Sequence, residues 1–87
     1  ENAQLLLMYG YSLGKIDSIA AGVRVFKQIP NGDNYRQLAD WYRGLFLLEE
    51  GDNSREVISI FCAIAGNDYH RKRKAAKELL KYFPEGC

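Results

Sequence analysis

Residues 39–52 read ADWYRGLFLLEEGD, and this segment carries the clearest structural signal in the chain. Its apolar side chains recur three or four positions apart, which is the spacing of one face of an α-helix. Asp33 precedes the segment and can cap a helix, and Gly51 can end it, because glycine tolerates the backbone conformation found at helix C-termini. We therefore expect one helix over residues 34–50, with a main apolar stripe of Leu38, Trp41, Tyr42, Leu45 and Leu48.

The rest of the chain repeats this pattern of an apolar helical segment followed by a stop signal. The alternation of β-branched residues that is typical of strands is not sustained anywhere. We expect further helices over residues 2–13, 17–29, 53–65 and 68–83, ended by Gly14, Pro30, Gly66 and Pro84. Within the second of them, Gly22 indicates a close helix contact. The predicted fold class is all-α, with about five antiparallel helices in a single domain that spans residues 1–87.

Two glycines at similar places indicate an internal repeat. Gly14 and Gly51 each follow a segment rich in Leu and Tyr and lie 37 residues apart (51 − 14), close to the ~34 residues of a tetratricopeptide repeat. Residues 39–52, with Gly44 seven positions before Gly51, resemble the first helix and turn of that repeat, and the second helix is matched by Val57, Phe61 and Ile64. Four residues depart from the family pattern. In the first unit, Leu7 stands where Gly44 would correspond, and Lys15 replaces the Asp of the turn. In the second unit, Val57 is bulkier than the Ala that usually starts the second helix, and Gly66 stands where a proline often closes the repeat.

This resemblance implies a fold, a function and a setting. A tetratricopeptide-like domain is a right-handed α-α superhelix, here of two helix hairpins plus a terminal helix, and it binds a peptide or protein in its groove. Residues 74–80, KAAKELL, are similar to the last helix of bacterial tetratricopeptide-like domains, which often follow a membrane anchor and face outside the cytoplasm. Because the chain starts with Glu1 rather than Met and an expected helix begins at once, we expect the chain to be a fragment of a longer protein. The sequence does not determine the compartment of the protein. One interpretation is that the chain is the extracytoplasmic part of a membrane-anchored bacterial protein.

The charge balance argues against several classes of partner. Twelve basic and eleven acidic residues leave a formal net charge of +1, whereas proteins that bind nucleic acids or membrane surfaces electrostatically carry a strong positive excess. No apolar run approaches the ~20 residues that cross a bilayer. We therefore expect a protein or peptide partner, no nucleic acid and no membrane contact by this segment itself. The chain could also form a homo-oligomer, which the sequence does not decide.

The chain offers little catalytic or metal-binding chemistry. His70 is the only histidine, and beside three basic residues we expect it to be a solvated surface residue. Two cysteines make neither a disulfide framework nor, without further ligands, a zinc site. We expect Cys62 to be a small buried hydrophobe, because it falls beside Ile58 and Ala65 at helical spacing, and Cys87 to be frayed, because it is the last residue. No phosphate-loop, zinc-protease or calcium-loop motif occurs. The sequence therefore predicts a protein that is no enzyme and that has no metal and no cofactor.

The first candidate binding surface is the groove of the repeat. If the repeat alignment holds, the groove is lined by Gln4, Met8 and Tyr11 from the first unit and by Trp41, Leu45 and Leu48 from the second. These residues overlap the expected core, so the groove is either filled by the chain's own helices or is an apolar patch that awaits a partner. We expect Trp41 to be structural first.

The second candidate is a basic stripe on the last expected helix, formed by Arg71, Lys74, Lys77 and Lys81. It is either a solvated helix face or a docking site for an acidic peptide or for phosphate groups. The opposite face should cover the fourth helix with Tyr69, Ala76, Leu79, Leu80 and Phe83. Lys72 falls in the middle of that face, so its stem should pack while its ammonium group reaches water.

Two functional hypotheses follow. The first is a protein–protein interaction module that binds a peptide or protein in a groove between stacked helix hairpins. The alternative is a structural solenoid fragment, or a dimerisation segment, whose apolar surface meets neighbouring repeats. A fragment of the second kind should self-associate when it is isolated, whereas a complete module should be monomeric.

Overall fold

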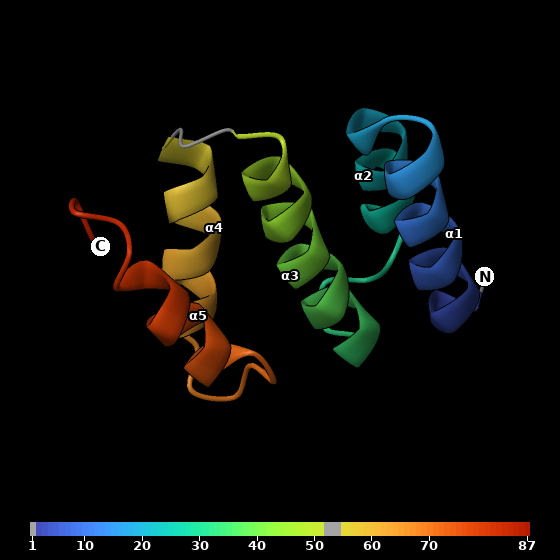
Figure 1. Ribbon diagram of the computed structural model, residues 1–87. Coiled ribbons are helices and arrows are strands. Elements are labelled where there is room, and N and C mark those ends of the chain that lie inside the picture. Colours follow the sequence, from blue (N-terminus) through green and yellow to red (C-terminus); the bar gives the residue numbers. More distant parts are fainter. Residues whose placement is uncertain (1, 52–54) are drawn as a thin grey trace.

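The computed structural model describes residues 2–51 and 55–87. This part of the chain folds into five α-helices and contains no strand, which confirms the predicted all-α class (Figure 1). The helices are α1 (Ala3–Ile16), α2 (Ile19–Phe26), α3 (Asn34–Glu49), α4 (Arg55–Ala65) and α5 (Arg73–Leu80). The predicted start of the fourth helix, at residue 53, lies outside the described residues.

Local capping signals fix the start of α2 and both ends of α3. The Ser18 Oγ accepts a hydrogen bond from the backbone N–H of Ala21 at 3.0 Å, and the Asp33 Oδ1 accepts one from that of Tyr35 at 2.8 Å. At the other end of α3, Gly51 has a φ of +83°, which L side chains rarely adopt. Because these signals are local in sequence, the observed bounds of α3 differ from the predicted ones by only one residue.

The first two helices end elsewhere than predicted. α1 continues through Gly14 to Ile16, because Gly14 is held inside the helix pair, where an added β-carbon would collide with the Phe46 ring. α2 ends at Phe26 rather than at residue 29, and the chain then turns. Ile29 is nevertheless only 1% exposed, so the turn after α2 still contributes to the core.

The last helix is shorter than the predicted 68–83. Asn67 forms an Asx turn, in which its Oδ1 accepts the backbone N–H of Tyr69 at 3.0 Å, and its carbonyl accepts that of His70 at 3.0 Å. Such side-chain bonds compete with helical ones, so the helix begins only at Arg73. Tyr69 does not cover α4 as predicted, because it is 90% exposed. The other four residues of that predicted face do pack against the core around α4: Ala76, Leu79, Leu80 and Phe83.

The five helices follow one another in space as they do in sequence. α1 packs against α2, both pack against α3, α3 packs against α4, and α4 packs against α5. Figure 1 shows the helices as a row in which neighbours alternate in direction, with the two termini at opposite ends of the molecule. The principal extents are 38 × 28 × 15 Å. The right-handed superhelical twist stays a prediction.

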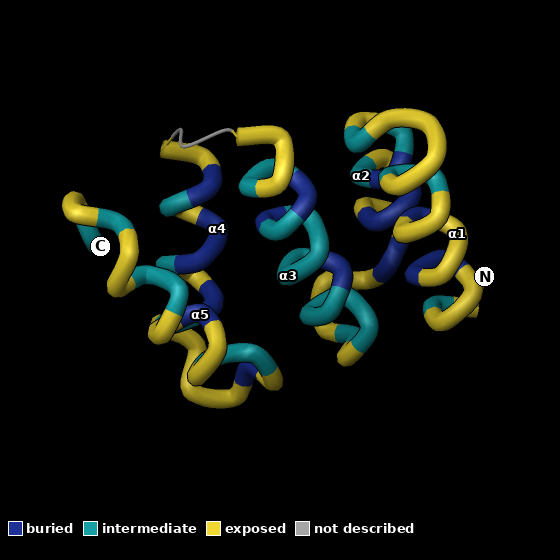
Figure 2. Tube along the Cα trace, viewed as in Figure 1, coloured by how far each residue is buried: buried dark blue, intermediate teal, exposed yellow. Residues whose placement is uncertain are grey.

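The core consists of two clusters, one on each side of α3. The first joins α1, α2 and α3 around Leu6, Leu7, Val25, Phe26, Ile29, Ala39 and Phe46. The second joins α3, α4 and α5 around Val57, Ile60, Phe61, Ile64 and Ala76. Figure 2 shows these buried positions on the facing sides of neighbouring helices. α3 therefore contributes to both halves of the core. No helix in the described part of the chain is both long enough and apolar enough to cross a membrane.

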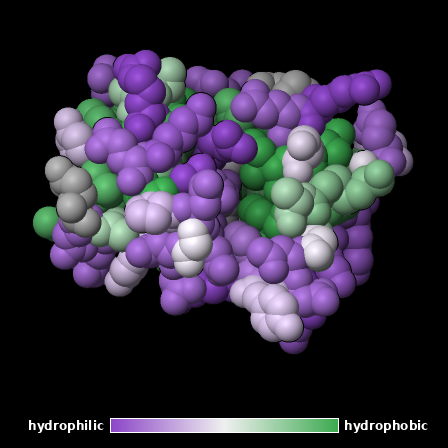
Figure 3. Space-filling model, turned by 180° about the vertical axis from the view of Figure 1, so that it is seen from behind, coloured by the Kyte–Doolittle hydropathy of each residue, from purple (hydrophilic) through white to green (hydrophobic). Residues whose placement is uncertain are grey.

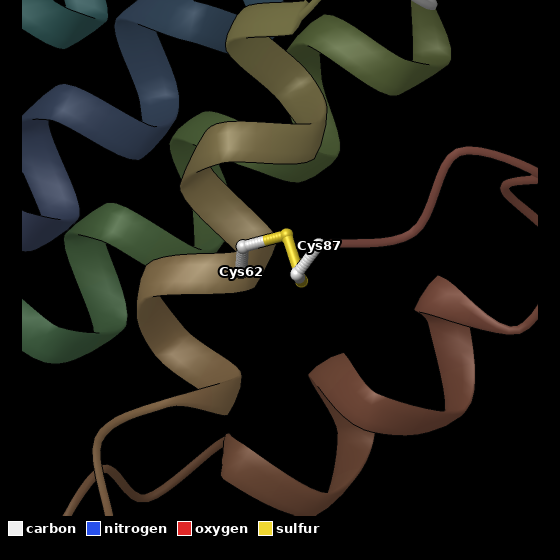
Figure 4. The surroundings of a disulfide bond; sticks show 2 residues. All are labelled: Cys62 and Cys87. Atoms are coloured by element: carbon white, nitrogen blue, oxygen red, sulfur yellow. A yellow bond between two sulfur atoms is a disulfide. The ribbon is translucent and has the colours of Figure 1, made fainter.

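The two cysteines are joined, which corrects the prediction for both. Cys62 in α4 and Cys87 form a disulfide with their Cα atoms 5.7 Å apart (Figure 4). Cys62 is half-buried beside the C-terminal segment, so it is not a buried free thiol. Cys87 is not a frayed end, since the bond ties it to the middle of α4. The pairing links positions 25 residues apart, and only the tertiary fold brings them together.

Candidate binding surfaces

The outward face of α1 is apolar and unused by the fold. Leu5, Met8, Tyr9 and Ile16 recur at helical spacing on the side opposite the buried Leu6 and Leu7, and each of the four is more than half exposed. The only charged residue of α1 is Lys15. Figure 2 shows the exposed side of this helix along the edge of the molecule. Contiguous apolar surface of this kind typically marks an interaction site. We call Leu5, Met8, Tyr9 and Ile16 the α1 outer face.

A shallow pocket adjoins this face where α1 meets α3. It has a volume of about 280 Å³ and is lined by Leu7, Met8, Tyr11 and Ser12 of α1 and by Tyr42 of α3. The Tyr11 ring packs edge-on against the Tyr42 ring, with centroids 5.0 Å apart, and lies 5.5 Å from the Phe46 ring. Aromatic rings that pack against one another in this way hold each other in place, so they make a stiff wall. We call this hollow the α1–α3 pocket.

Lys15 lies beside the Tyr11 wall of the α1–α3 pocket and is paired with an acidic residue. Its Nζ lies 5.9 Å from the centroid of the Tyr11 ring and 3.6 Å from the Glu49 carboxylate. Gln4, another predicted groove residue, is exposed one turn before Met8. The structure therefore leaves all three groove residues predicted on the first helix open to solvent.

The groove residues predicted on α3 have a different environment. Trp41, Leu45 and Leu48 are half-buried and pack against the second core cluster. The Trp41 ring lies edge-on to the Phe61 ring with centroids 5.4 Å apart. The chain's own helices therefore cover the residues that were predicted to line the groove on α3, whereas those predicted on α1 are exposed. Lys72 is half-buried, and its Nζ lies 5.9 Å from the centroid of the Trp41 ring. It precedes α5 as the N-cap residue instead of lying in the middle of a helix face, and contact of its ammonium group with water stays a prediction.

The basic residues near the C-terminus do not form one helical stripe. Arg71 precedes α5, and its backbone N–H donates to the Gln37 Oε1 at 3.0 Å. Lys74 and Lys77 lie on α5 and are exposed. Lys81 follows the helix and forms an ion pair of 3.1 Å with Glu78, both side chains being well solvated. The loss of the first helical turns separates Arg71 from the others.

His70 is buried, contrary to the prediction of a solvated histidine. It is only 9% exposed, and its Nδ1 accepts a hydrogen bond from the backbone N–H of Lys72 at 3.0 Å. Burial lowers the pKa of His70 below 6.5, while the negative charge of Asp40 and the backbone carbonyl of Gln37 act in the opposite direction. Sequence reasoning missed this burial because it depends on the turn at Asn67, which directs His70 towards α3.

His70 borders a polar pocket between α3, α4 and the turn that follows α4. The pocket has a volume of about 280 Å³, and its lining includes Arg36, Asp40, Arg43, Asn67 and His70. The Arg36 Nε donates to the Asp40 Oδ1 at 3.2 Å. None of the predicted binding residues lies here, so this polar pocket is a second site that the sequence did not indicate.

Other surfaces are less distinctive. Seen from behind, in Figure 3, the molecule is largely hydrophilic, and hydrophobic side chains gather most densely over the half that carries α4.

Within residues 2–51 and 55–87, no group of three or more His, Cys, Asp and Glu side chains is placed to hold a metal ion.

Comparisons with known proteins leave the family open. No protein-family model matches the chain, and no curated protein and no solved structure matches it. The resemblance to tetratricopeptide repeats therefore remains a prediction from the residues of 39–64.

Proposed function

We propose that this chain is a protein–protein interaction module that binds an amphipathic helical segment of a partner along α1. The observation that carries this proposal is the α1 outer face, a row of large apolar side chains that no part of the described fold covers. Folding alone does not account for a helix that is apolar on both sides, because one apolar face suffices to pack it against a core.

The dimensions of the surface suit a helix. From Leu5 to Ile16 the face spans about 16 Å at 1.5 Å per residue, which matches a partner helix that presents residues i, i+3 or i+4 and i+7. A bulky apolar residue of that helix would occupy the α1–α3 pocket between Met8 and Tyr42.

The alternative function, a solenoid fragment or dimerisation segment, would use the same face. α1 lies at one end of the helix row, so a neighbouring repeat or a second copy of the chain could extend the row there. The two functions differ in whether the chain self-associates. Sedimentation velocity across a range of concentrations therefore separates them.

The test is a selection of helical peptides on the wild-type chain, followed by affinity measurements on single variants. Met8→Ala should weaken binding at least about tenfold, because hot-spot residues at the centre of an interface commonly contribute that much. Tyr69→Ala, which removes another exposed aromatic ring far from α1, should leave the affinity within about twofold. A monomeric chain whose selected peptides bind Met8→Ala and the wild type equally would overturn the proposal. So would a chain that dimerises through α1.

A further inference from the structure

Two buried side-chain nitrogens, on residues that border the polar pocket, have no hydrogen-bond partner among the described residues. The Arg43 Nε and the His70 Nε2 are both buried, and neither is paired with any of the described residues. An unpaired buried donor destabilises the folded state, so native proteins contain few of them. Two such donors around a single pocket indicate that something absent from the folded chain accepts from them.

The His70 Nε2 must carry a proton whenever the ring is neutral. The Nδ1 accepts the backbone N–H of Lys72 at 3.0 Å, so its lone pair is in use and it holds no proton. A neutral imidazole has one protonated nitrogen, which places the proton on Nε2. This nitrogen is therefore a donor that makes no hydrogen bond of ordinary geometry with the described residues, although the Gln37 backbone carbonyl lies close enough to act on the ring.

Arg43 differs from its neighbour Arg36 in how its guanidinium group is used. Arg36 donates through Nε to Asp40 and through Nη1 to the Ile29 carbonyl at 2.7 Å. The Arg43 Nε has no such acceptor among the described residues, so the side of the guanidinium that bears it has an unused donor. That side binds a carboxylate through two parallel hydrogen bonds.

We propose that the polar pocket binds a carboxylate, which accepts hydrogen bonds from the Arg43 guanidinium and the His70 Nε2. The charges lining the pocket fit a monoanion, since Arg36 and Arg43 together outweigh Asp40 by one positive charge. A phosphate dianion suits the pocket less, because Asp40 repels the second negative charge at close range. The ligand is a small carboxylic acid or an acidic side chain of a peptide.

Entry of the ligand requires a movement of Arg43. Its Nε and the His70 Nε2 are both enclosed in the ligand-free chain, but the Arg43 side chain is only half-buried and also borders a second hollow, towards α2. A turn of the long side chain opens the polar pocket without a change in the backbone. The inferred site is separate from the α1 outer face, so the two proposals stand or fall independently.

The experiment follows the Arg43 Nε–H and His70 ring resonances by NMR while sodium acetate is added at constant ionic strength. A capped tripeptide with one central glutamate forms a second arm, and chloride and inorganic phosphate are the comparison anions. We expect acetate to shift both resonances in a saturable way, with a dissociation constant on the order of 1–10 mM for a single charge-assisted site. Saturation by the tripeptide as well would identify an acidic peptide as the ligand, whereas saturation by acetate alone would identify a small acid.

Three variants sharpen the test. Arg43→Gln should weaken acetate binding at least about tenfold, whereas Asp40→Asn should strengthen it about fivefold by removing a like charge. Arg71→Gln is the matched control, because it removes an exposed positive charge next to His70 but outside the pocket lining, and it should change the affinity less than about twofold. If Arg43→Gln fails to fold, Arg43→Lys replaces it, since it keeps the charge but has no Nε.

Several outcomes would overturn the inference. Equal shifts with chloride would mean that any anion is attracted non-specifically. A cross-peak between water and the His70 ring that acetate leaves unchanged would mean that an ordered water alone fills the pocket. The Arg43 Nε–H resonance can also be compared between wild type and Asp40→Asn without any ligand. A difference in its position would mean that Asp40 itself pairs with Arg43 in solution.

Discussion

Gly22 of α2 lies against the backbone of Gly10 of α1, so closely that a β-carbon on Gly22 would be 2.5 Å from the Gly10 carbonyl oxygen. The same carbon would be 2.9 Å from the Gly14 nitrogen. Real β-carbons do not approach other atoms so closely, and backbone atoms of a helix cannot swing aside. The two helices thus meet through their main chains, and the contact that Gly22 indicates in the sequence is confirmed.

Gly22→Ala should destabilise the protein by about 1–3 kcal/mol, because the added methyl group separates two packed helices. Helix propensity acts in the opposite direction by about 1 kcal/mol, so a loss of stability in urea unfolding would reflect the contact alone. Gly32→Ala is the control, since nothing lies within 4 Å of its added carbon. That variant should be neutral or gain up to about 1 kcal/mol. Equal stability of Gly22→Ala and wild type would contradict the close contact.

Reduction of the Cys62–Cys87 disulfide should lower the free energy of unfolding by about 2–4 kcal/mol, because the cross-link restricts the unfolded chain. The measurement is the denaturation midpoint with and without a thiol reductant. The double variant Cys62→Ala/Cys87→Ala should show the lower midpoint in both conditions. A wild-type midpoint that does not respond to complete reduction would contradict a stabilising role.

Stability should fall as the pH decreases from about 7.5 to about 5.5. Burial lowers the pKa of His70 in the folded state below its usual 6.5, so the unfolded state binds the proton first and stability rises with pH in this window. The charged groups that face the ring across the pocket are Asp40, Arg36 and Arg43 of α3. Carboxylates titrate mainly below this range, and the chain has only one histidine.

His70→Gln isolates this effect because it removes the titrating ring but keeps a side-chain donor. Urea unfolding of this variant at both pH values should give a smaller difference in stability than the wild type gives. An identical pH dependence in the two proteins would show that His70 is not the responsible group.

Trp41→Ala should cost about 3 kcal/mol, near the lower end for a large aromatic residue, because the ring is half-buried rather than fully buried. It removes the edge-on contact with Phe61 and the cation–π contact with Lys72. Trp41→Phe keeps part of the apolar contact and should cost less than half as much. Thermal unfolding of both variants tests this, and an unchanged midpoint for Trp41→Ala would instead make Trp41 an exposed binding anchor.

Replacement of Lys74 and Lys77 by Gln should change stability by less than about 0.5 kcal/mol, since both side chains are exposed. If these lysines dock an acidic partner, the same variant should associate with it more slowly at low salt, and the difference should shrink as salt rises. Stopped-flow association at two ionic strengths tests that role. A double variant that binds as fast as wild type at low salt would leave a solvated face as the role of these lysines.

The sequence predicted those features whose causes are local. α3 was predicted within one residue because Asp33 caps it and Gly51 adopts a positive φ, and both signals lie beside the helix. Gly14 was misread as a stop, because whether a glycine ends a helix or admits a neighbouring ring depends on Phe46, which is distant in sequence. The length of α5 was overestimated because the helical spacing of its apolar residues continues through Tyr69, where the Asn67 side chain forms a turn instead.

The candidate sites were predictable to different degrees. Met8 and Tyr11 were singled out from the repeat pattern, and the structure leaves both exposed beside a pocket. The polar pocket could not be anticipated, since its lining comes from two helices and a turn whose position depends on how α5 begins. The disulfide was equally hidden, because a separation of 25 residues between cysteines says nothing of their distance in a folded chain.

The position of the disulfide determines how the molecule would carry a mechanical load. With the termini at opposite ends of the row, tension applied between residues 2 and 87 pulls along the long axis. Force entering at Cys87 passes through the covalent bond directly to Cys62 in α4. The chain between these two cysteines, including all of α5, therefore bears no tension while the bond is intact. Under reducing conditions the same pull would detach α5 first. The residues between Cys62 and Cys87 would then extend before the force reaches α4.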